Sequence, residues 1–195
     1  MKRLGLPLDE ISYLILTHTH FDHCRSAKVI QDSSSCKIVV SSFAEGSISN
    51  GYTAIPKGTN FVTKQISRFG RLVGKRGFGY APFSPDVLIQ DNYIVDSANE
   101  QITIIKTPGH SDDSISVILD NDIAIVGDAM FGVLKNNIFP PYADNVQELI
   151  QSWNSLLNTE CKVFLPGHGK EIKRELLQKE YDRYSLEYNI VLPQN

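Results

Sequence analysis

A seven-residue segment, Thr17–His23, follows directly after an apolar run and carries four side chains that can bind a metal ion. These side chains are His18, His20, Asp22 and His23. The run before them, residues 11–16, is typical of a short buried strand. Because side chains alternate along a strand, the first two histidines point to the same side and can hold one ion. The aspartate and the last histidine lie on the turn that follows, so the spacing predicts a second ion.

The other two histidines of the chain also come directly after apolar runs. Both His110 and His168 are preceded by a Pro-Gly pair, which ends a strand and lets the backbone pass close to a ligand. Asp128 also comes directly after an apolar run, residues 123–127. Any one histidine alone is equally well explained as a hydrogen-bonded or solvated side chain. All five at strand ends indicate a shared role.

Four motifs together, HxHxDH, TPGH, GDxxF and PGHG, resemble in order and separation those of the metallo-β-lactamase fold hydrolases, over residues 1 to about 175. The resemblance implies an α/β fold of layered α+β type, an αββα sandwich, with residues 1–195 as one domain. It also implies two divalent metal ions. In that case His18, His20 and His110 hold the first ion, Asp22, His23 and His168 hold the second, and Asp128 bridges both.

The reaction implied by the resemblance is metal-activated hydrolysis. A hydroxide held between two ions would attack a carbonyl or phosphoryl group, and Asp22, the candidate catalytic residue, would orient it and carry its proton. Neutral imidazoles with carboxylates suit zinc, with iron or manganese as alternatives. The commonest zinc β-lactamases carry a cysteine where this chain has Asp128, so the resemblance is to the glyoxalase II, lactonase and phosphodiesterase-like branches. The bond cleaved is then an ester, lactone, thioester or phosphodiester.

Two other functions stay open on the sequence. The same fold with iron serves as a redox protein, and a shortened domain can bind metal without catalysis until a partner chain completes it. Only Met1 to Glu10 precede the first apolar run, whereas family members carry further strands there. We therefore expect a domain that is shortened at its N-terminus, and we hypothesise a homodimer closed at the uncovered sheet edge.

Residues 46–85 differ in composition from the rest of the chain, because they contain no acid and many glycines and aromatics. Their basic residues are Lys57, Lys64, Arg68, Arg71, Lys75 and Arg76. The dense glycines predict that no single helix runs through 70–79. We interpret 46–85 as a lid, with aromatic side chains for the apolar body of a small-molecule substrate and basic ones for an anionic group. The alternative is a solvated charged face with some aromatics in the core.

Composition sets limits on the class of protein. A chain of 195 residues with 42% apolar and 21% charged residues is ordinary for one soluble globular domain. No apolar run reaches the roughly 20 residues that span a bilayer, and we expect a cytoplasmic protein. The net charge of −3 argues against nucleic-acid binding. The three cysteines show no paired spacing, and we expect Cys24, beside His23, to be a buried inert thiol rather than a ligand.

The remaining pattern alternates strands and helices. Residues 114–126 predict a hairpin, and a helix that begins at a capping box of Asp144 and Gln147 follows. Another helix is expected from about Glu171. In the turn after His110, Asp112 or Asp113 could orient a metal-bound imidazole, since such rings usually donate their second N–H to a carboxylate or carbonyl.

Overall fold

The computed structural model describes residues 7–95 and 101–190 of the chain. The smaller of its two sheets is formed by three strands from the N-terminal half. Its strands are β1 (Tyr13–Ile15), β2 (Lys37–Ser41) and β3 (Val87–Ile89), in that order and all parallel. The central strand is the most buried, since Ile38, Val39 and Val40 of β2 are almost entirely covered, whereas β1 is half-buried and Leu88 of β3 is exposed. Parallel strands covered on both faces have this near-continuous apolar character.

The larger sheet contains six strands in sequence order. They are β4 (Tyr93–Val95), β5 (Ile102–Lys106), β6 (Ile115–Leu119), β7 (Ile123–Gly127), β8 (Val163–Pro166) and β9 (Ile172–Lys173). Neighbouring strands are antiparallel except β7 and β8, which are parallel and are connected through helix α6. The β6–β7 hairpin confirms the hairpin predicted from the sequence.

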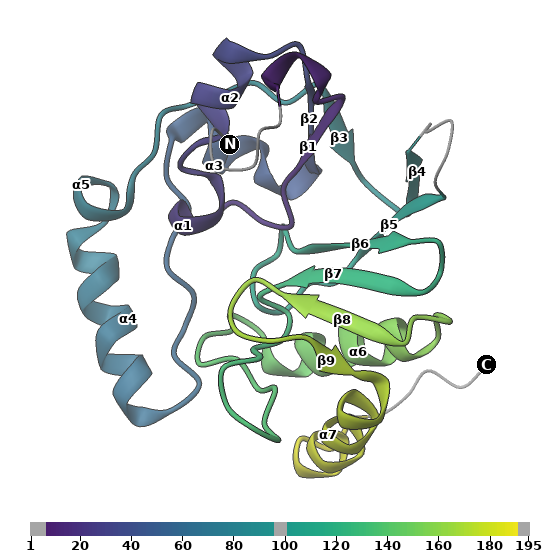
Figure 1. The fold of residues 1–195 in the computed structure, drawn as a ribbon. Coiled ribbons are helices and arrows are strands. Elements are labelled where there is room, and N and C mark those ends of the chain that lie inside the picture. Colours follow the sequence, from purple (N-terminus) through teal and green to yellow (C-terminus); the bar gives the residue numbers. More distant parts are fainter. Residues whose placement is uncertain (1–6, 96–100, 191–195) are drawn as a thin grey trace.

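Helices lie on the outer sides of the two sheets (Figure 1). Near the small sheet are η1 (Leu8–Glu10), α1 (Phe21–Cys24), α2 (Ala27–Ser33), η2 (Ser42–Ala44) and α3 (Glu45–Asn50). The large sheet is covered by α6 (Val146–Leu157) and α7 (Arg174–Glu187). The helices α4 (Phe61–Val73) and α5 (Lys75–Phe78) form a column along one edge of the molecule (Figure 1). Within the described ranges, no helix combines the length and apolarity needed to cross a membrane.

Three apolar clusters define the layers. One lies between the two sheets, where Val39 and Ile89 of the small sheet pack with Ile104 and Ile115 of the large one. A second joins the small sheet to α1, α2 and α3, and a third joins the large sheet to α6 and α7. The order helices, sheet, sheet, helices is the expected αββα sandwich.

The strand that leads to the metal motif is shorter than the sequence predicts. β1 ends at Ile15, so His18 and His20 lie beyond the strand in an extended loop rather than on it. The reason is a change of hydrogen-bond partner, because the Thr19 N–H donates to the Asp113 side chain and not to a neighbouring strand. Asp22 and His23 lie on the turn that follows, as predicted, and this turn is the single turn of α1.

Two helix starts also differ from the prediction. Asn145, rather than Asp144, caps α6 through its side chain, which accepts from the Glu148 N–H. Asp144 instead accepts hydrogen bonds from the Lys57 N–H and the Arg71 guanidinium. The last helix begins at Arg174 because residues 172–173 pair with β8 as a short strand. By contrast, the predicted helix break in 70–79 is confirmed, since α4 ends at Val73 before Gly74.

Candidate metal centre

The loops that follow β1, β5, β7 and β8 meet at one point, where they bring all seven candidate side chains together. Three overlapping groups have ligand atoms within 4.8 Å of one another. They are His18 with His20 and His110, His18 with His23 and Asp128, and Asp22 with His23 and His168. The first and third groups contain the same residues that the resemblance implies for two separate ions.

The Asp128 carboxylate lies between the two sets of histidines. Its Oδ2 is 3.7 Å from His110 Nε2 and 3.6 Å from His168 Nε2. Its Oδ1 is 3.4 Å from His23 Nε2. A carboxylate whose Oδ2 lies near a histidine of each set can contact two ions at once.

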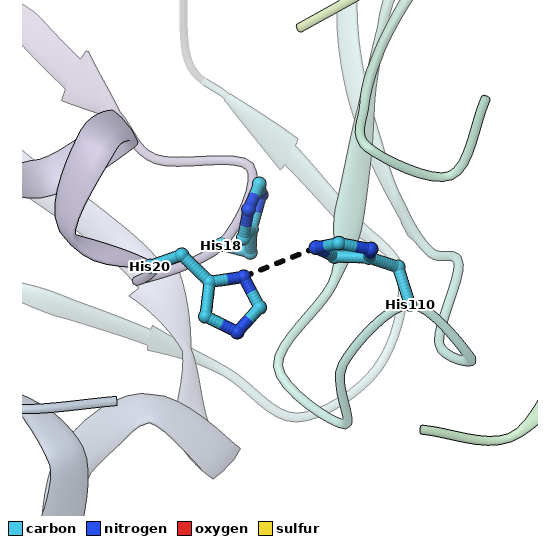
Figure 2. A group of neighbouring side chains, drawn as sticks. All are labelled: His18, His20 and His110. Carbon is cyan, nitrogen blue, oxygen red and sulfur yellow. Dashed lines mark hydrogen bonds between the residues drawn. The ribbon is translucent and has the colours of Figure 1, made fainter. Parts of the chain in front are cut away.

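The rings of His20 and His110 are nearly perpendicular and bring one nitrogen each together (Figure 2), with His20 Nδ1 and His110 Nε2 only 3.0 Å apart. The other nitrogen of each ring lies close to a backbone carbonyl oxygen. His20 Nε2 is 3.1 Å from the carbonyl of Ala54, and His110 Nδ1 is 2.9 Å from the carbonyl of Tyr142. A carbonyl only accepts, so both protons are assigned to these outer nitrogens. Two lone pairs then point at each other, an arrangement that a cation between them stabilises.

Electrostatics keep the buried rings neutral. Burial, with the nearby His110 and His20, holds the pKa of His18 well below its usual value. Burial also lowers the pKa of His110 to about 4. It lowers the pKa of His20 as well, although the carboxylates of Asp113 and Asp128 oppose the shift. Neutral imidazoles are the form that binds metals.

In the second set, the pKa of His23 depends on neighbouring carboxylates. Burial favours a lower pKa for His23, but the nearby carboxylates of Asp128 and Asp22 outweigh it and raise the pKa. Burial likewise favours a higher pKa for Asp128, but His23, His110 and His168 outweigh it and hold the pKa below its usual value. Asp128 is therefore ionised near neutral pH and offers anionic oxygens.

The donor set fits divalent metal ions. Among the described residues, His18 Nε2, His23 Nε2 and Asp128 Oδ1 are buried without a hydrogen-bond partner. Buried polar atoms rarely stay unpaired, and all three face this centre. Imidazole nitrogens with carboxylate oxygens are ligands of zinc, and also of iron and manganese. Because Gly167 has no side chain, His23 and Asp128 can occupy the space beside it, as expected for a glycine before a ligand-type histidine.

Asp113 supports the centre in a different way from the one expected. Its Oδ2 accepts from the backbone N–H and the hydroxyl of Thr19, and its Oδ1 accepts from the Ser111 hydroxyl. It therefore fixes the backbone between His18 and His20 rather than an imidazole, and Asp112 is exposed. The carbonyls of Ala54 and Tyr142 contact the rings instead. No sequence pattern indicated these two carbonyls, because every residue has one.

Cys24 lies next to His23 in the chain but belongs to none of the ligand groups found in the described residues. Its thiol donates to the Thr19 carbonyl at 3.2 Å. Burial raises the pKa of this thiol to about 12. A group with this pKa stays protonated near neutral pH, which agrees with the expected inert thiol.

A cavity of about 240 Å³ opens beside the centre. His20, Asp22, His110 and Asp128 line one part of it. The apolar side chains that line the rest are Phe21, Ile55, Pro56, Ile66, Phe69 and Phe78. Residues 46–85 thus supply most of the apolar wall, through α4, α5 and the loop before them.

The basic residues of 46–85 have a different position. Lys64, Arg68 and Arg71 line a second groove together with Lys57. Arg71 is held by Asp144 at 2.9 Å and by the Ile55 carbonyl. An anionic group on the substrate therefore stays a prediction, and the cavity itself is walled by apolar side chains.

Comparison with known proteins agrees with this geometry. The chain is 24% identical over 178 residues to an atrochrysone carboxyl ACP thioesterase of Aspergillus fumigatus, covering 89% of this chain and 44% of that protein. It is 28% identical over 122 residues to Glyoxylase B2 of Dictyostelium discoideum, covering 63% and 36%. The chain thus spans less than half the length of both relatives.

The fold is that of an archaeal protein of the metallo-beta-lactamase superfamily from Sulfolobus tokodaii, with a TM-score of 0.64 at 19% identity. The match covers 96% of this chain and 73% of that one. The family model of the metallo-beta-lactamase superfamily matches residues 1–168, which include all seven side chains of the centre. The chain therefore belongs to the metallo-beta-lactamase superfamily.

Proposed function

We propose that this chain is a metal-dependent hydrolase that holds two divalent ions, most simply zinc, and cleaves an ester or thioester beside an apolar group. The observation that carries the proposal is the overlap of the three ligand groups, with Asp128 close to both sets of histidines. His18, His20 and His110 would hold one ion, and Asp22, His23 and His168 the other. Asp128 would contact both.

Two ions held by these residues would supply an activated water and would polarise the bond that is attacked. The residues of the chain supply position and proton transfer. Asp22 lines the cavity, and its Oδ2 lies 3.4 Å from His168 Nε2 and 3.8 Å from His23 Nε2. From this place the carboxylate can accept the proton that the attacking water loses and pass it to the leaving group.

The apolar cavity supports a substrate with a hydrocarbon group next to the bond that breaks. One relative is named a thioesterase and another a glyoxylase, which supports the ester and thioester candidates over the lactone and the phosphodiester. Each methylene that enters such a cavity contributes about 0.8 kcal/mol. We therefore expect kcat/KM to rise roughly fourfold per added methylene until the cavity is filled.

The first test measures metal content and hydrolysis together. Purified protein is analysed by inductively coupled plasma mass spectrometry and assayed on acyl esters and thioesters of increasing length, a lactone and a phosphodiester. We expect two zinc ions per chain and turnover of the acyl substrates. Asp128→Ala should lose metal and activity together. Asp22→Asn should lower kcat by about a hundredfold or more, the usual contribution of a positioned proton-transfer group.

Asp112→Asn is the matched control. Asp112 is an exposed acid close to His110 in the sequence, and it belongs to none of the ligand groups among the described residues. It should leave metal content and kcat unchanged. Full turnover by Asp128→Ala would exclude the bridging role. One iron per chain without hydrolysis would favour the redox alternative, and protein that binds no metal and hydrolyses nothing would contradict the proposal.

A further inference from the structure

The helix α4 exposes a stripe of large apolar side chains along its whole length. They are Phe61, Val62, Ile66, Phe69 and Leu72, and each is between 51% and 85% exposed. Their spacing places them on one face of the helix, while Ser67 and Gly70 on another face are buried against the body of the protein. A continuous exposed stripe of this kind marks an interaction surface rather than scattered surface residues.

Basic side chains lie beside this stripe. Lys64 and Arg68 are exposed on α4, and Lys75 and Arg76 are exposed on α5. For these four the described part of the chain offers no ion-pair partner, in contrast to Arg71, which is paired with Asp144. Residues 46–85 hold six of the nineteen basic residues of the chain and none of its 22 acids. The surface is therefore apolar and positive at once.

The apolar stripe continues into the cavity of the metal centre. Ile66 and Phe69 belong to both, because they are largely exposed and also line the cavity. An apolar molecule that contacts the stripe thus reaches the cavity without crossing a polar barrier on α4.

We propose that α4 and α5 bind an anionic lipid surface, with the apolar stripe in the interface and the basic residues at the headgroups. An apolar stripe beside Lys and Arg is the pattern of helices that lie in a membrane surface. A second copy of this chain fits less well, since two such surfaces facing each other would bring like charges together. In this position the cavity opens toward the lipid, which could supply an apolar substrate directly. The binding itself does not depend on hydrolysis.

The test is co-sedimentation of the full chain with large vesicles, either of phosphatidylcholine alone or with one third phosphatidylglycerol. We expect binding to the anionic vesicles that weakens with added salt. Each basic residue near an anionic surface contributes about fivefold to the partition coefficient, so Lys64→Glu with Arg68→Glu should lower it by roughly 25-fold or more. Phe61→Ser with Val62→Ser and Leu72→Ser should lower it by roughly a hundredfold, because three large side chains leave the interface.

Matched controls use residues of similar exposure elsewhere. Val29→Ser with Leu186→Ser removes two side chains that are 66% and 80% exposed on α2 and α7. Lys170→Glu with Lys179→Glu reverses two exposed charges outside 46–85. Both control variants should bind anionic vesicles like the original chain, and circular dichroism checks that every variant is folded.

Three results would overturn the proposal. The first is no binding to anionic vesicles by the folded original chain. The second is equal loss of binding in the α4 variants and in the controls. The third is a combination of two observations: the original chain does not bind vesicles, and it forms a concentration-dependent dimer in sedimentation velocity that the apolar triple variant no longer forms. This result would assign the stripe to self-association.

Discussion

Gly167 lies so close to the metal centre that a methyl group at this position would overlap two of its side chains. A Cβ there would lie 2.5 Å from Asp128 Oδ1 and 2.6 Å from His23 Cε1. Neither atom belongs to a flexible surface group, because the Asp128 side chain is buried and that of His23 is only 16% exposed. This glycine is therefore a condition for the position of both ligand-type residues.

We predict that Gly167→Ala weakens metal binding by about 10- to 100-fold, the usual effect of disturbing residues behind a metal ligand. The measurement is competition for zinc with a chromophoric chelator. Gly46→Ala is the control, since a Cβ at this glycine of α3 would have no neighbour within 4 Å. Equal zinc affinity in both variants would show that the centre adapts to the added methyl group.

At the scale of elements, the loop after β1 and the loop after β5 are joined by one buried carboxylate. Asp113 binds Thr19, which lies 94 residues earlier between His18 and His20. The Thr19 hydroxyl also forms a hydrogen bond with the Thr53 hydroxyl, at 2.9 Å. The Thr53 hydroxyl in turn contacts the Tyr80 hydroxyl at 2.8 Å, so the same chain of hydrogen bonds reaches residues 46–85.

We predict that Asp113→Ala lowers the free energy of unfolding of the metal-free protein by about 2–4 kcal/mol. The buried Thr19 N–H and two hydroxyls would lose their acceptor, and an unpaired buried donor costs about 1–3 kcal/mol. Urea denaturation followed by tryptophan fluorescence measures the change. Asp112→Ala, at the exposed neighbouring position, should stay within about 0.5 kcal/mol of the original chain. Equal midpoints for the two variants would contradict the role given to Asp113.

The role of residues 46–85 was open on the sequence, because their aromatic and basic residues fitted either a lid or a solvated charged face with some aromatics in the core. The structure places one side of the apolar stripe at the cavity and leaves the rest exposed, while Arg71 is held by Asp144 and the Ile55 carbonyl. Phe78 of α5 contacts Phe21 of α1, with the ring centroids 5.1 Å apart. Both aromatic rings line the cavity, so α5 and α1 form one wall.

At the scale of the whole molecule, β1 is at the end of the small sheet, where β2 is its neighbour within the described ranges. A strand at the end of a sheet can pair with a strand of another chain. We propose that two copies pair at this edge. Sedimentation velocity at tens of micromolar should then give about twice the chain mass of 21.8 kDa. A mass of one chain would contradict the proposal. The apolar triple variant of α4 should still dimerise, since the β1 edge does not involve α4.

The sequence by itself determined which residues are candidates for the metal centre and most of the elements that carry them. Strand, hairpin and helix patterns depend on neighbours along the chain, so the β6–β7 hairpin, a helix in the place of α6 and the break after α4 could be predicted. The ligand-type residues could be predicted because each follows an apolar run, and their order matches a known family.

The tertiary structure decided which of these residues meet. His20 and His110 are 90 residues apart and come from loops of different sheets, and their contact depends on how the two sheets pack face to face. The same packing decided that Asp113 binds Thr19 rather than an imidazole, and that the apolar stripe of α4 faces solvent. Such contacts between distant residues leave no local pattern, because they depend on the relative position of whole elements and not on the spacing of residues within one.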